Sequence, residues 1–144
     1  MATEPMYLAA YQGDAQRIAQ LLAEGADPNA RADGGTTSLM VAADRGHAAV
    51  VAALIDAGAE VNAQDDSGQT ALVQAASAGQ TEVVALLLKV GADPNIRTGD
   101  GRTALSSGKW RRRDFHIWRW MFVWAVPVRP DDRLIRMLLD AGAK

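Results

Sequence analysis

The sequence contains no cysteine and only two histidines among its 144 residues. The absence of cysteine excludes disulfide bonds, thiolate metal sites and thiol catalysis, and it is compatible with a reducing compartment. Aromatic residues make up only 6 % of the chain. Alanine and leucine, which favour helix, supply much of the 49 % of apolar residues. This apolar fraction is ordinary for a globular chain and argues against wholesale disorder.

A long hydrophobic run is missing as well. The longest apolar stretch, from Trp120 to Val128, is shorter than the roughly 20 residues that a membrane-spanning helix needs. The N-terminus has no basic segment followed by an apolar one, which would indicate a secretory signal. We therefore expect a soluble protein in the cytoplasm. The formal net charge of −2 argues against a chain that binds nucleic acid over its whole surface.

The sequence also lacks a catalytic constellation. His47 follows a glycine at a predicted helix start, where a packing or turn role is favoured, and His116 lies among aromatic residues. The adjacent carboxylates Asp65-Asp66 and Asp131-Asp132 fall at a turn and at a helix start, and the second pair complements the helix N-terminus. No glycine-rich loop has a lysine behind it for holding phosphates. We predict that the protein is not an enzyme and binds no cofactor or metal.

What the sequence does contain is a repeat of 33 residues. When the copies of the repeat are aligned, six columns of equivalent positions hold the same residue at this spacing. They are Gly25, Gly58 and Gly91; Asn29, Asn62 and Asn95; Thr37, Thr70 and Thr103; Leu39, Leu72 and Leu105; the pairs Ala9-Ala10, Ala42-Ala43 and Ala75-Ala76; and Gly13, Gly46 and Gly79. Six independent columns in one register are hard to obtain by chance. The glycines, the alanine pairs and the asparagines are expected to have structural roles.

One unit of the repeat predicts two helices and a turn. The segment Thr37–Arg45 predicts a short helix with Thr37 as its N-cap and Gly46 at its end. A second helix is predicted from His47 to Ala57, with an apolar face at Val50, Val51, Leu54 and Ile55. The polar segment 61–68 predicts a turn, whose backbone the asparagine column is expected to hydrogen-bond. Because one such pair cannot bury its own apolar face, the copies must stack.

Several motifs resemble the ankyrin repeat. They are Thr37-Ser38-Leu39-Met40, Thr70-Ala71-Leu72-Val73, Gly46-His47, the segment Val50–Leu54 and Gly91-Ala92-Asp93-Pro94-Asn95. The match covers about residues 4–105 and 130–144, although no copy keeps both the proline and the histidine of the family's Thr-Pro-Leu-His motif. The resemblance implies an all-α solenoid of helix-turn-helix repeats that acts as a scaffold or adaptor and binds another protein without a cofactor.

The repeat register predicts a single domain over residues 1–144. We place four repeats at about 3–32, 33–65, 66–98 and 99–144, the first of which acts as the N-terminal cap. The last repeat is interrupted, because Gly142 continues the column of Gly91 with a delay of 18 residues. Leu134, Ile135, Leu138 and Leu139 are expected to form its second apolar face.

The excess sequence is assigned to an insertion within about 106–129. The usual alanine pair and closing glycine are absent there, so we expect the short first helix of the fourth repeat to be missing. A turn is predicted at Ser106-Ser107-Gly108, followed by a helix from Lys109 to Ala125 that Pro127 ends. A strand over Ile117 to Val126 is the alternative.

The insertion concentrates aromatic and basic residues. Between Lys109 and Arg129 lie all four tryptophans, both phenylalanines and six basic residues against one acid, so this window carries +5 and the rest of the chain −7. Three interpretations stay open: a cap over the end of the third repeat, a partner-binding element, or attachment to a membrane surface through Arg111-Arg112-Arg113 and the tryptophans. Self-association through the insertion, RNA binding and a sequence accident such as a shifted reading frame are further alternatives, and we expect a monomer that does not bind nucleic acid.

The resemblance also implies where a partner binds. Ankyrin repeats hold partners on the concave side, through the turn tips and the exposed positions of the first helices. In this sequence those positions are Tyr11, Gln12, Asp33, Thr36, Asp44, Arg45, Asp66, Ser67, Gln69, Ser77, Ala78 and Arg102, to which the insertion adds Arg111, Trp118 and Trp120. The row is polar and mixed in charge, so a solvated surface is the alternative for each residue. It does not predict a hydrophobic groove.

Overall fold

The computed structural model describes residues 3–110 and 130–143, which form four pairs of helices. The pairs are α1 (Thr3–Gln12) with α2 (Ala15–Ala23), α3 (Ser38–Arg45) with α4 (Ala48–Asp56), α5 (Ala71–Ala78) with α6 (Thr81–Lys89), and α7 (Ala104–Trp110) with α9 (Pro130–Asp140). A short 3-10 turn, η1 (Asp33–Gly35), precedes α3. In these two ranges the only β-type pairing is an isolated bridge between Arg31 and Thr37. The predicted all-α architecture of helix-turn-helix units is therefore confirmed.

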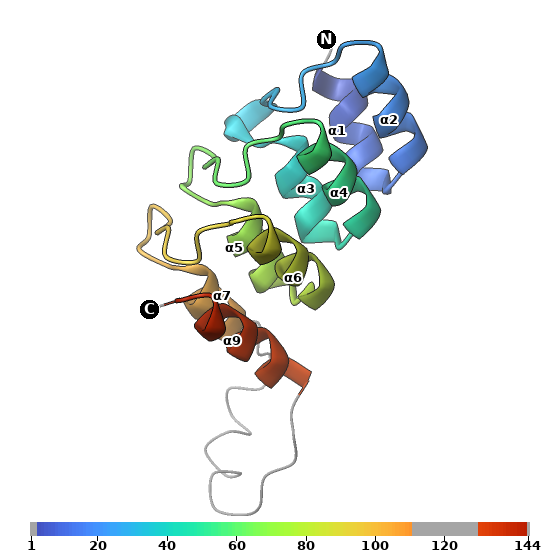
Figure 1. The fold of residues 1–144 in the computed structure, drawn as a ribbon. Helices are drawn as coiled ribbons and strands as arrows, with labels where there is room; N and C mark the ends of the chain where they lie inside the picture. Colours follow the sequence, from blue (N-terminus) through green and yellow to red (C-terminus); the bar gives the residue numbers. More distant parts are fainter. Residues whose placement is uncertain (1–2, 111–129, 144) are drawn as a thin grey trace, which may run out of the picture.

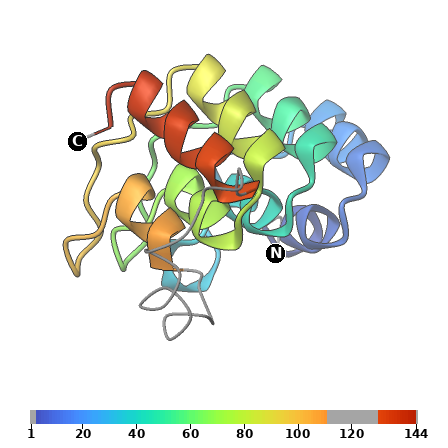
Figure 2. The same ribbon diagram turned by 90° about the horizontal axis from the view of Figure 1, so that it is seen from below.

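The pairs stack side by side into a solenoid with two layers (Figure 1). Viewed from below, α1, α3, α5 and α7 form an inner layer, and α2, α4, α6 and α9 form an outer one (Figure 2). The long connections between pairs project along one edge as turn tips. The inner helices α3, α5 and α7 each start next to a tip and run towards the opposite edge of the inner layer.

The helix ends follow the local capping chemistry of the sequence. The Thr37 Oγ1 accepts a hydrogen bond from the Met40 N–H at 3.3 Å, and the Thr70 Oγ1 accepts one from the Val73 N–H at 3.2 Å. At the other end of α3, Gly46 takes the left-handed conformation with φ 78°, which a residue without a Cβ adopts readily. The predicted helices 37–45 and 47–57 are therefore confirmed to within a residue at each end.

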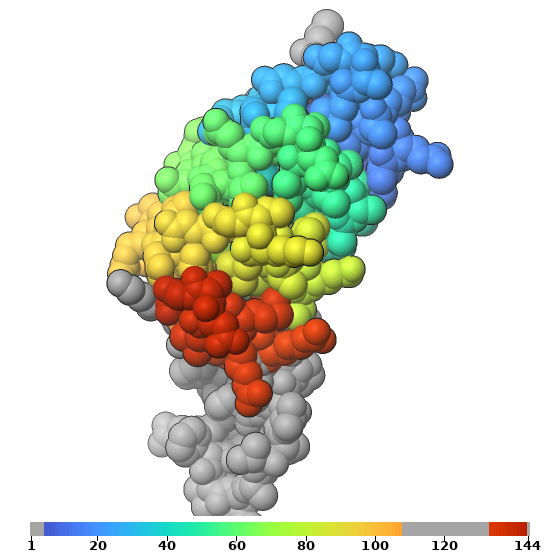
Figure 3. Space-filling model, in the orientation of Figure 1, coloured from blue at the N-terminus to red at the C-terminus, as the bar shows by residue number. Residues whose placement is uncertain are grey.

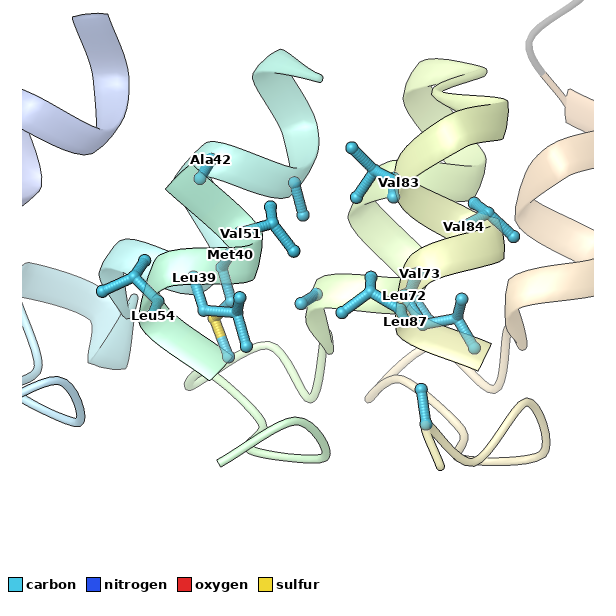
Figure 4. Packing of buried hydrophobic residues seen from close by; sticks show 14 of the residues in the cluster. Leu39, Met40, Ala42, Val51, Leu54, Leu72, Val73, Val83, Val84 and Leu87 are labelled. Carbon is cyan, nitrogen blue, oxygen red and sulfur yellow. The ribbon is translucent and has the colours of Figure 1, made fainter. Parts of the chain in front are cut away.

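The core is a continuous aliphatic cluster that runs through the stack (Figure 4). The alanine pairs of the inner helices are at most 3 % exposed, so their small side chains allow neighbouring inner helices to approach closely. Val50, Val51 and Leu54 of α4 are completely buried. Burying one such side chain stabilises the fold by about 1.5–3 kcal/mol, and the successive bands of Figure 3 show each pair covering the flank of the next.

The fourth pair corrects two of the sequence predictions. The short first helix is present, because α7 runs from Ala104 to Trp110, and the predicted turn at Ser106-Ser107-Gly108 is wrong, since these residues lie inside it. The physical reason is a reciprocal cap: the Thr103 N–H donates to the Ser106 Oγ at 2.8 Å, and the Ser106 N–H donates to the Thr103 Oγ1 at 3.4 Å. The serine starts a helix instead of ending one. The predicted helix over 109–125 and its strand alternative lie almost wholly outside the described residues.

The second helix of this pair matches its predicted apolar face in part. Leu134 and Leu138 are buried, and Ile135 is half-buried. Leu139 is 50 % exposed, so it contributes less to the core than the sequence pattern predicted. In the described part of the chain, no helix is long and apolar enough to cross a membrane.

The asparagine column connects consecutive pairs. The Asn29 Nδ2 donates to the Gly58 carbonyl at 3.1 Å, and its Oδ1 accepts from the Glu60 N–H at 2.6 Å. The Asn62 Oδ1 likewise accepts from the Asp93 N–H at 2.8 Å. The prediction that these side chains bond the backbone of the long turn is therefore corrected: they bond the segment that ends the next pair. The asparagines thus hold one unit of the solenoid to the following one.

Candidate protein-binding surface

The predicted site residues that the structure describes fall into two rows on the inner layer. One row lies on the turn tips and the other at the C-terminal ends of the inner helices. The tip row contains Asp33, Thr36, Asp66, Ser67, Gln69 and Arg102, and the helix-end row contains Tyr11, Gln12, Asp44, Arg45, Ser77 and Ala78. All twelve are exposed or half-buried. Arg111, Trp118 and Trp120 lie outside the described residues.

The tips are held in register by hydrogen bonds between consecutive units. The Asp66 N–H donates to the Gly34 carbonyl at 2.9 Å, and the Gly99 N–H donates to the Ser67 carbonyl at 2.8 Å. Because each tip is bonded to the next, the exposed side chains of the row have a fixed spacing. A surface organised before binding loses less conformational entropy when a partner docks.

A second ladder lies behind the tips and is made by one column of side chains. The Arg31 guanidinium donates to the Gly35 and Gln64 carbonyls at 3.3 and 2.8 Å. One repeat later, the Gln64 Nε2 donates to the Gly68 and Arg97 carbonyls at 2.9 and 3.1 Å. Each side chain therefore ties its own tip to the next unit. This column was not among the predicted ones, although the 33-residue step from Arg31 to Gln64 and Arg97 is visible in the sequence.

Two neighbouring carboxylates of the tip that precedes α5 differ in what they can offer a partner. The Asp65 Oδ1 accepts from the Ser67 and Gln69 N–H groups, both at 2.9 Å, so Asp65 holds the turn together. Asp66 is exposed, and within the described residues its carboxylate has no hydrogen bond or ion pair. Asp66 is therefore the residue of the two that remains available for binding, whereas the amides of Ser67 and Gln69 are engaged.

At the tip that precedes α7, Arg102 is already paired. Its Nε donates to the Asp100 Oδ2 at 2.6 Å, and the hydroxyl of Thr98 donates to the other carboxylate oxygen. These bonds, first that of Thr98 and then the pairing with Arg102, hold the pKa of Asp100 below its ordinary value. The positive charge of Arg102 is consequently neutralised in part by Asp100. This ion pair was not predicted from the sequence.

The helix-end row carries a different set of contacts. The Arg45 guanidinium lies over the ring of Tyr11, 3.8 Å from its centroid, which is a cation–π arrangement. The His47 Nε2 lies 3.1 Å from the Tyr11 carbonyl oxygen and donates to it, in agreement with the structural role predicted for this histidine. Gln80, one repeat later, uses its Nε2 to donate to the Asp44 carbonyl at 3.0 Å. Both bonds cross from one pair to the preceding inner helix.

A hollow opens in this row between the ends of α3 and α5. Its volume is about 440 Å³, and its lining consists of Asp44, Arg45, Ser77, Ala78 and Gln80. Four of these residues were predicted as surface positions, whereas the hollow and the part played by Gln80 were not predicted. Within residues 3–110 and 130–143, no group of three or more histidine, aspartate or glutamate side chains is arranged to hold a metal ion.

These features define a class: a solenoid of stacked helix pairs whose projecting tips and inner-helix ends form one continuous polar surface. A family model of ankyrin repeats, in three copies, matches residues 6–98. The chain belongs to the ankyrin-repeat family. No curated protein matches the sequence. Ankyrin repeats are generally protein–protein interaction modules, and the family is a class of non-enzymatic binding scaffolds.

Proposed function

We propose that this protein is a scaffold that binds one protein partner across its inner layer, through both the tip row and the helix-end row. The observation that carries the proposal is the pair of hydrogen-bond ladders, which fix the tips relative to one another while their outer side chains stay exposed. A rigid polar row of this kind supports recognition in which a few side chains supply most of the binding energy. No catalytic step or cofactor is part of the proposal.

We also propose that the whole chain is one domain of four repeats. The family model covers three copies, and α7 with α9 supplies the fourth pair. Its support is that the Asn95 Nδ2 donates to the Gly142 carbonyl at 3.0 Å, which matches the bond from Asn29 to Gly58 in the first unit. The insertion then belongs inside the fourth repeat, between its two helices.

The insertion is the basis of the alternative function, which is attachment to a membrane surface or self-association. The observation in its favour is the concentration of basic and tryptophan residues between Lys109 and Arg129. Salt-sensitive binding to anionic liposomes that is lost when Arg111, Arg112 and Arg113 are changed to serine would support a membrane role. A molar mass that rises with concentration in light scattering would support self-association over the proposed cytoplasmic monomer.

The primary proposal is tested by site-specific photo-crosslinking in extracts of the source cells. A photoreactive residue is placed at Thr36 or Ser67 on the tip row, or at Gln16 or Glu82 on the exposed side of the outer helices. We expect the same adduct from both tip positions, none from the outer positions, and loss of the adduct when Asp33 and Asp66 are changed to arginine. Adducts formed mainly from Gln16 or Glu82 would contradict the proposed surface.

A further inference from the structure

The hollow between α3 and α5 exists because side-chain size drops along the helix-end row. One repeat earlier, the corresponding place beside α1 is occupied by Tyr11 with Arg45 stacked on its ring. The corresponding residues at the next junction, 33 positions later, are Asp44 and Ala78, which are smaller and leave the space beside Ser77 open. The backbone framework is unchanged, since Gln80 donates to the Asp44 carbonyl in the same way as His47 donates to the Tyr11 carbonyl. The 440 Å³ of the hollow greatly exceeds the roughly 10–15 Å³ that a site needs to hold one water molecule.

The charges around this hollow favour a cation. Asp44 is exposed, and within the described residues its carboxylate has no ion pair or hydrogen bond. The guanidinium of Arg45 lies over Tyr11 on the side of α1, and neighbouring positions on a helix do not face each other. The inner helices α1, α3 and α5 all end at this edge, where the partial negative charge of a helix C-terminus attracts cations.

An anion bound through Arg45 is the competing possibility. Such a ligand would lie close to the Asp44 carboxylate and to the C-terminal ends of two helices, both of which repel it. It would also have to compete with the Tyr11 ring for the face of the guanidinium. A cationic ligand meets neither obstacle.

We propose that the hollow receives a lysine or arginine side chain of the partner. The Asp44 carboxylate forms the ion pair, the Ser77 hydroxyl accepts a hydrogen bond, and Ala78 leaves the room for the alkyl stem. This inference rests on the proposed protein-binding function and assigns one part of its recognition chemistry. It makes Asp44 a residue that selects partners with an exposed basic side chain.

The test is an amide NMR titration of the intact protein with a blocked peptide, acetyl-Gly-Arg-Gly-amide. The neutral control is the same peptide with citrulline, which keeps the shape of arginine but removes the charge, and a glutamate peptide tests for anion binding. We expect the arginine peptide to shift the amide signals of Asp44–Gly46 and Ser77–Gln80 with weak affinity, and the effect to fall as salt is added. The citrulline and glutamate peptides are expected to leave these signals in place.

Two variants assign the effect to the hollow. Asp44→Asn is expected to lower the affinity for the arginine peptide about two- to fivefold, which is the range for an exposed ion pair. The matched control is Asp56→Asn, which removes the same charge from an exposed position at the end of an outer helix. Ser77→Tyr fills the space and is expected to abolish binding without unfolding the protein, because Ser77 is exposed.

Equal shifts with the arginine and citrulline peptides, or equal effects of Asp44→Asn and Asp56→Asn, would overturn the proposal. Shifts with the glutamate peptide alone would replace it with an anion site at Arg45. The crosslinking experiment separates a failure of the proposed protein-binding function from a failure of the inferred role of the hollow. A partner that crosslinks to the tips while the arginine peptide fails leaves the protein-binding function intact and removes only the role of Asp44. Peptide binding without crosslinks from the tips would keep the hollow as a site for basic side chains and contradict the proposed partner-binding surface.

Discussion

Two neighbouring junctions of the solenoid share a backbone and differ in their side chains. At the first junction, between α1 and α3, Arg45 stacks on Tyr11 and His47 donates to the Tyr11 carbonyl. At the second junction, between α3 and α5, Gln80 makes the equivalent bond to the Asp44 carbonyl, but small side chains leave a hollow beside it. The first junction is closed and the second is open.

The comparison separates two tasks within the repeat. The side chains of His47 and Gln80, at the starts of α4 and α6, bond the preceding inner helix and preserve the geometry of the stack. The side chains at the ends of the inner helices then decide, by volume and charge, whether the surface is filled or hollow. An ankyrin-repeat surface can therefore change its binding properties at one junction while the fold remains the same.

The largest expected difference between the two junctions is in the loss of unfolding free energy when the glycines that end α1 and α3 are replaced by alanine. Gly13 and Gly46 both have φ 78°, so replacement by alanine costs each the same left-handed strain, about 1–2 kcal/mol. A Cβ on Gly13 would lie 2.6–2.9 Å from the His47 ring, whereas one on Gly46 would meet the flexible end of Gln80 at 2.4 Å. We expect Gly13→Ala to cost about 1 kcal/mol more, because the ring must rotate and lose its hydrogen bond.

This difference is measured by urea unfolding followed with far-UV circular dichroism. Gly58→Ala is the control, because its φ of 94° is also left-handed but a Cβ there has no atom within 4 Å. Equal losses of unfolding free energy in all three variants would mean that contact across the junctions contributes nothing.

The next effect compares the asparagines of the two junctions. Asn29 makes two hydrogen bonds to the following unit, to Gly58 and Glu60, and Asn62 makes the single bond to Asp93. At about 1 kcal/mol for each net hydrogen bond, Asn29→Ala is expected to lower the free energy of unfolding more than Asn62→Ala. Denaturant titrations of both variants check the order, and a larger loss for Asn62→Ala would contradict it.

A smaller effect is expected from the stacked pair at the first junction. Tyr11 is 44 % exposed, so its cation–π contact with Arg45 is worth about 0.5–1 kcal/mol. A double-mutant cycle with Tyr11→Leu and Arg45→Met measures this coupling energy. A coupling indistinguishable from zero would show that the stack fills the junction without stabilising it.

The smallest effect is expected when the Tyr11–Arg45 pair of the first junction is introduced at the equivalent positions of the second junction. The positions of Tyr11 and Arg45 correspond, 33 residues later, to Asp44 and Ala78. The double variant Asp44→Tyr with Ala78→Arg is expected to show a coupling of about 0.5 kcal/mol, the value for an exposed cation–π pair. The control is Asp44→Leu with Ala78→Arg, which lacks the aromatic face and should show no coupling in the same unfolding assay.

Much of the fold could be predicted from the sequence, because its signals are local. Thr37 and Gly46 mark the ends of α3 through bonds within a few residues of each, and the apolar face of α4 follows from spacing alone. The turn predicted at residues 106–108 was wrong because serine also serves as a helix cap, and the reciprocal bonds of Thr103 and Ser106 decided between the two roles. Local composition did not distinguish them.

The site was predicted less completely, because its decisive features connect different repeats. The exposed positions followed from the register, but the stacking of Arg45 on Tyr11 and the bond of Gln80 to Asp44 join residues more than 30 positions apart. The asparagines were assigned a role in bonding backbone, and only the direction of that bond, to the next unit, was missed. A hollow depends on the size of two side chains relative to their neighbours in space, which the sequence does not display.

The bond from Asn95 to Gly142 has a practical consequence. Asn29 reaches its glycine across 29 residues and Asn95 reaches its own across 47, a difference of 18, yet the two donor–acceptor distances are 3.1 and 3.0 Å. The connection between the two helices of a unit therefore accommodates added sequence without a change in how the unit closes on its neighbour. This connection is a natural grafting site, at which a peptide epitope or a reporter could be spliced into an ankyrin array while the array itself stays intact.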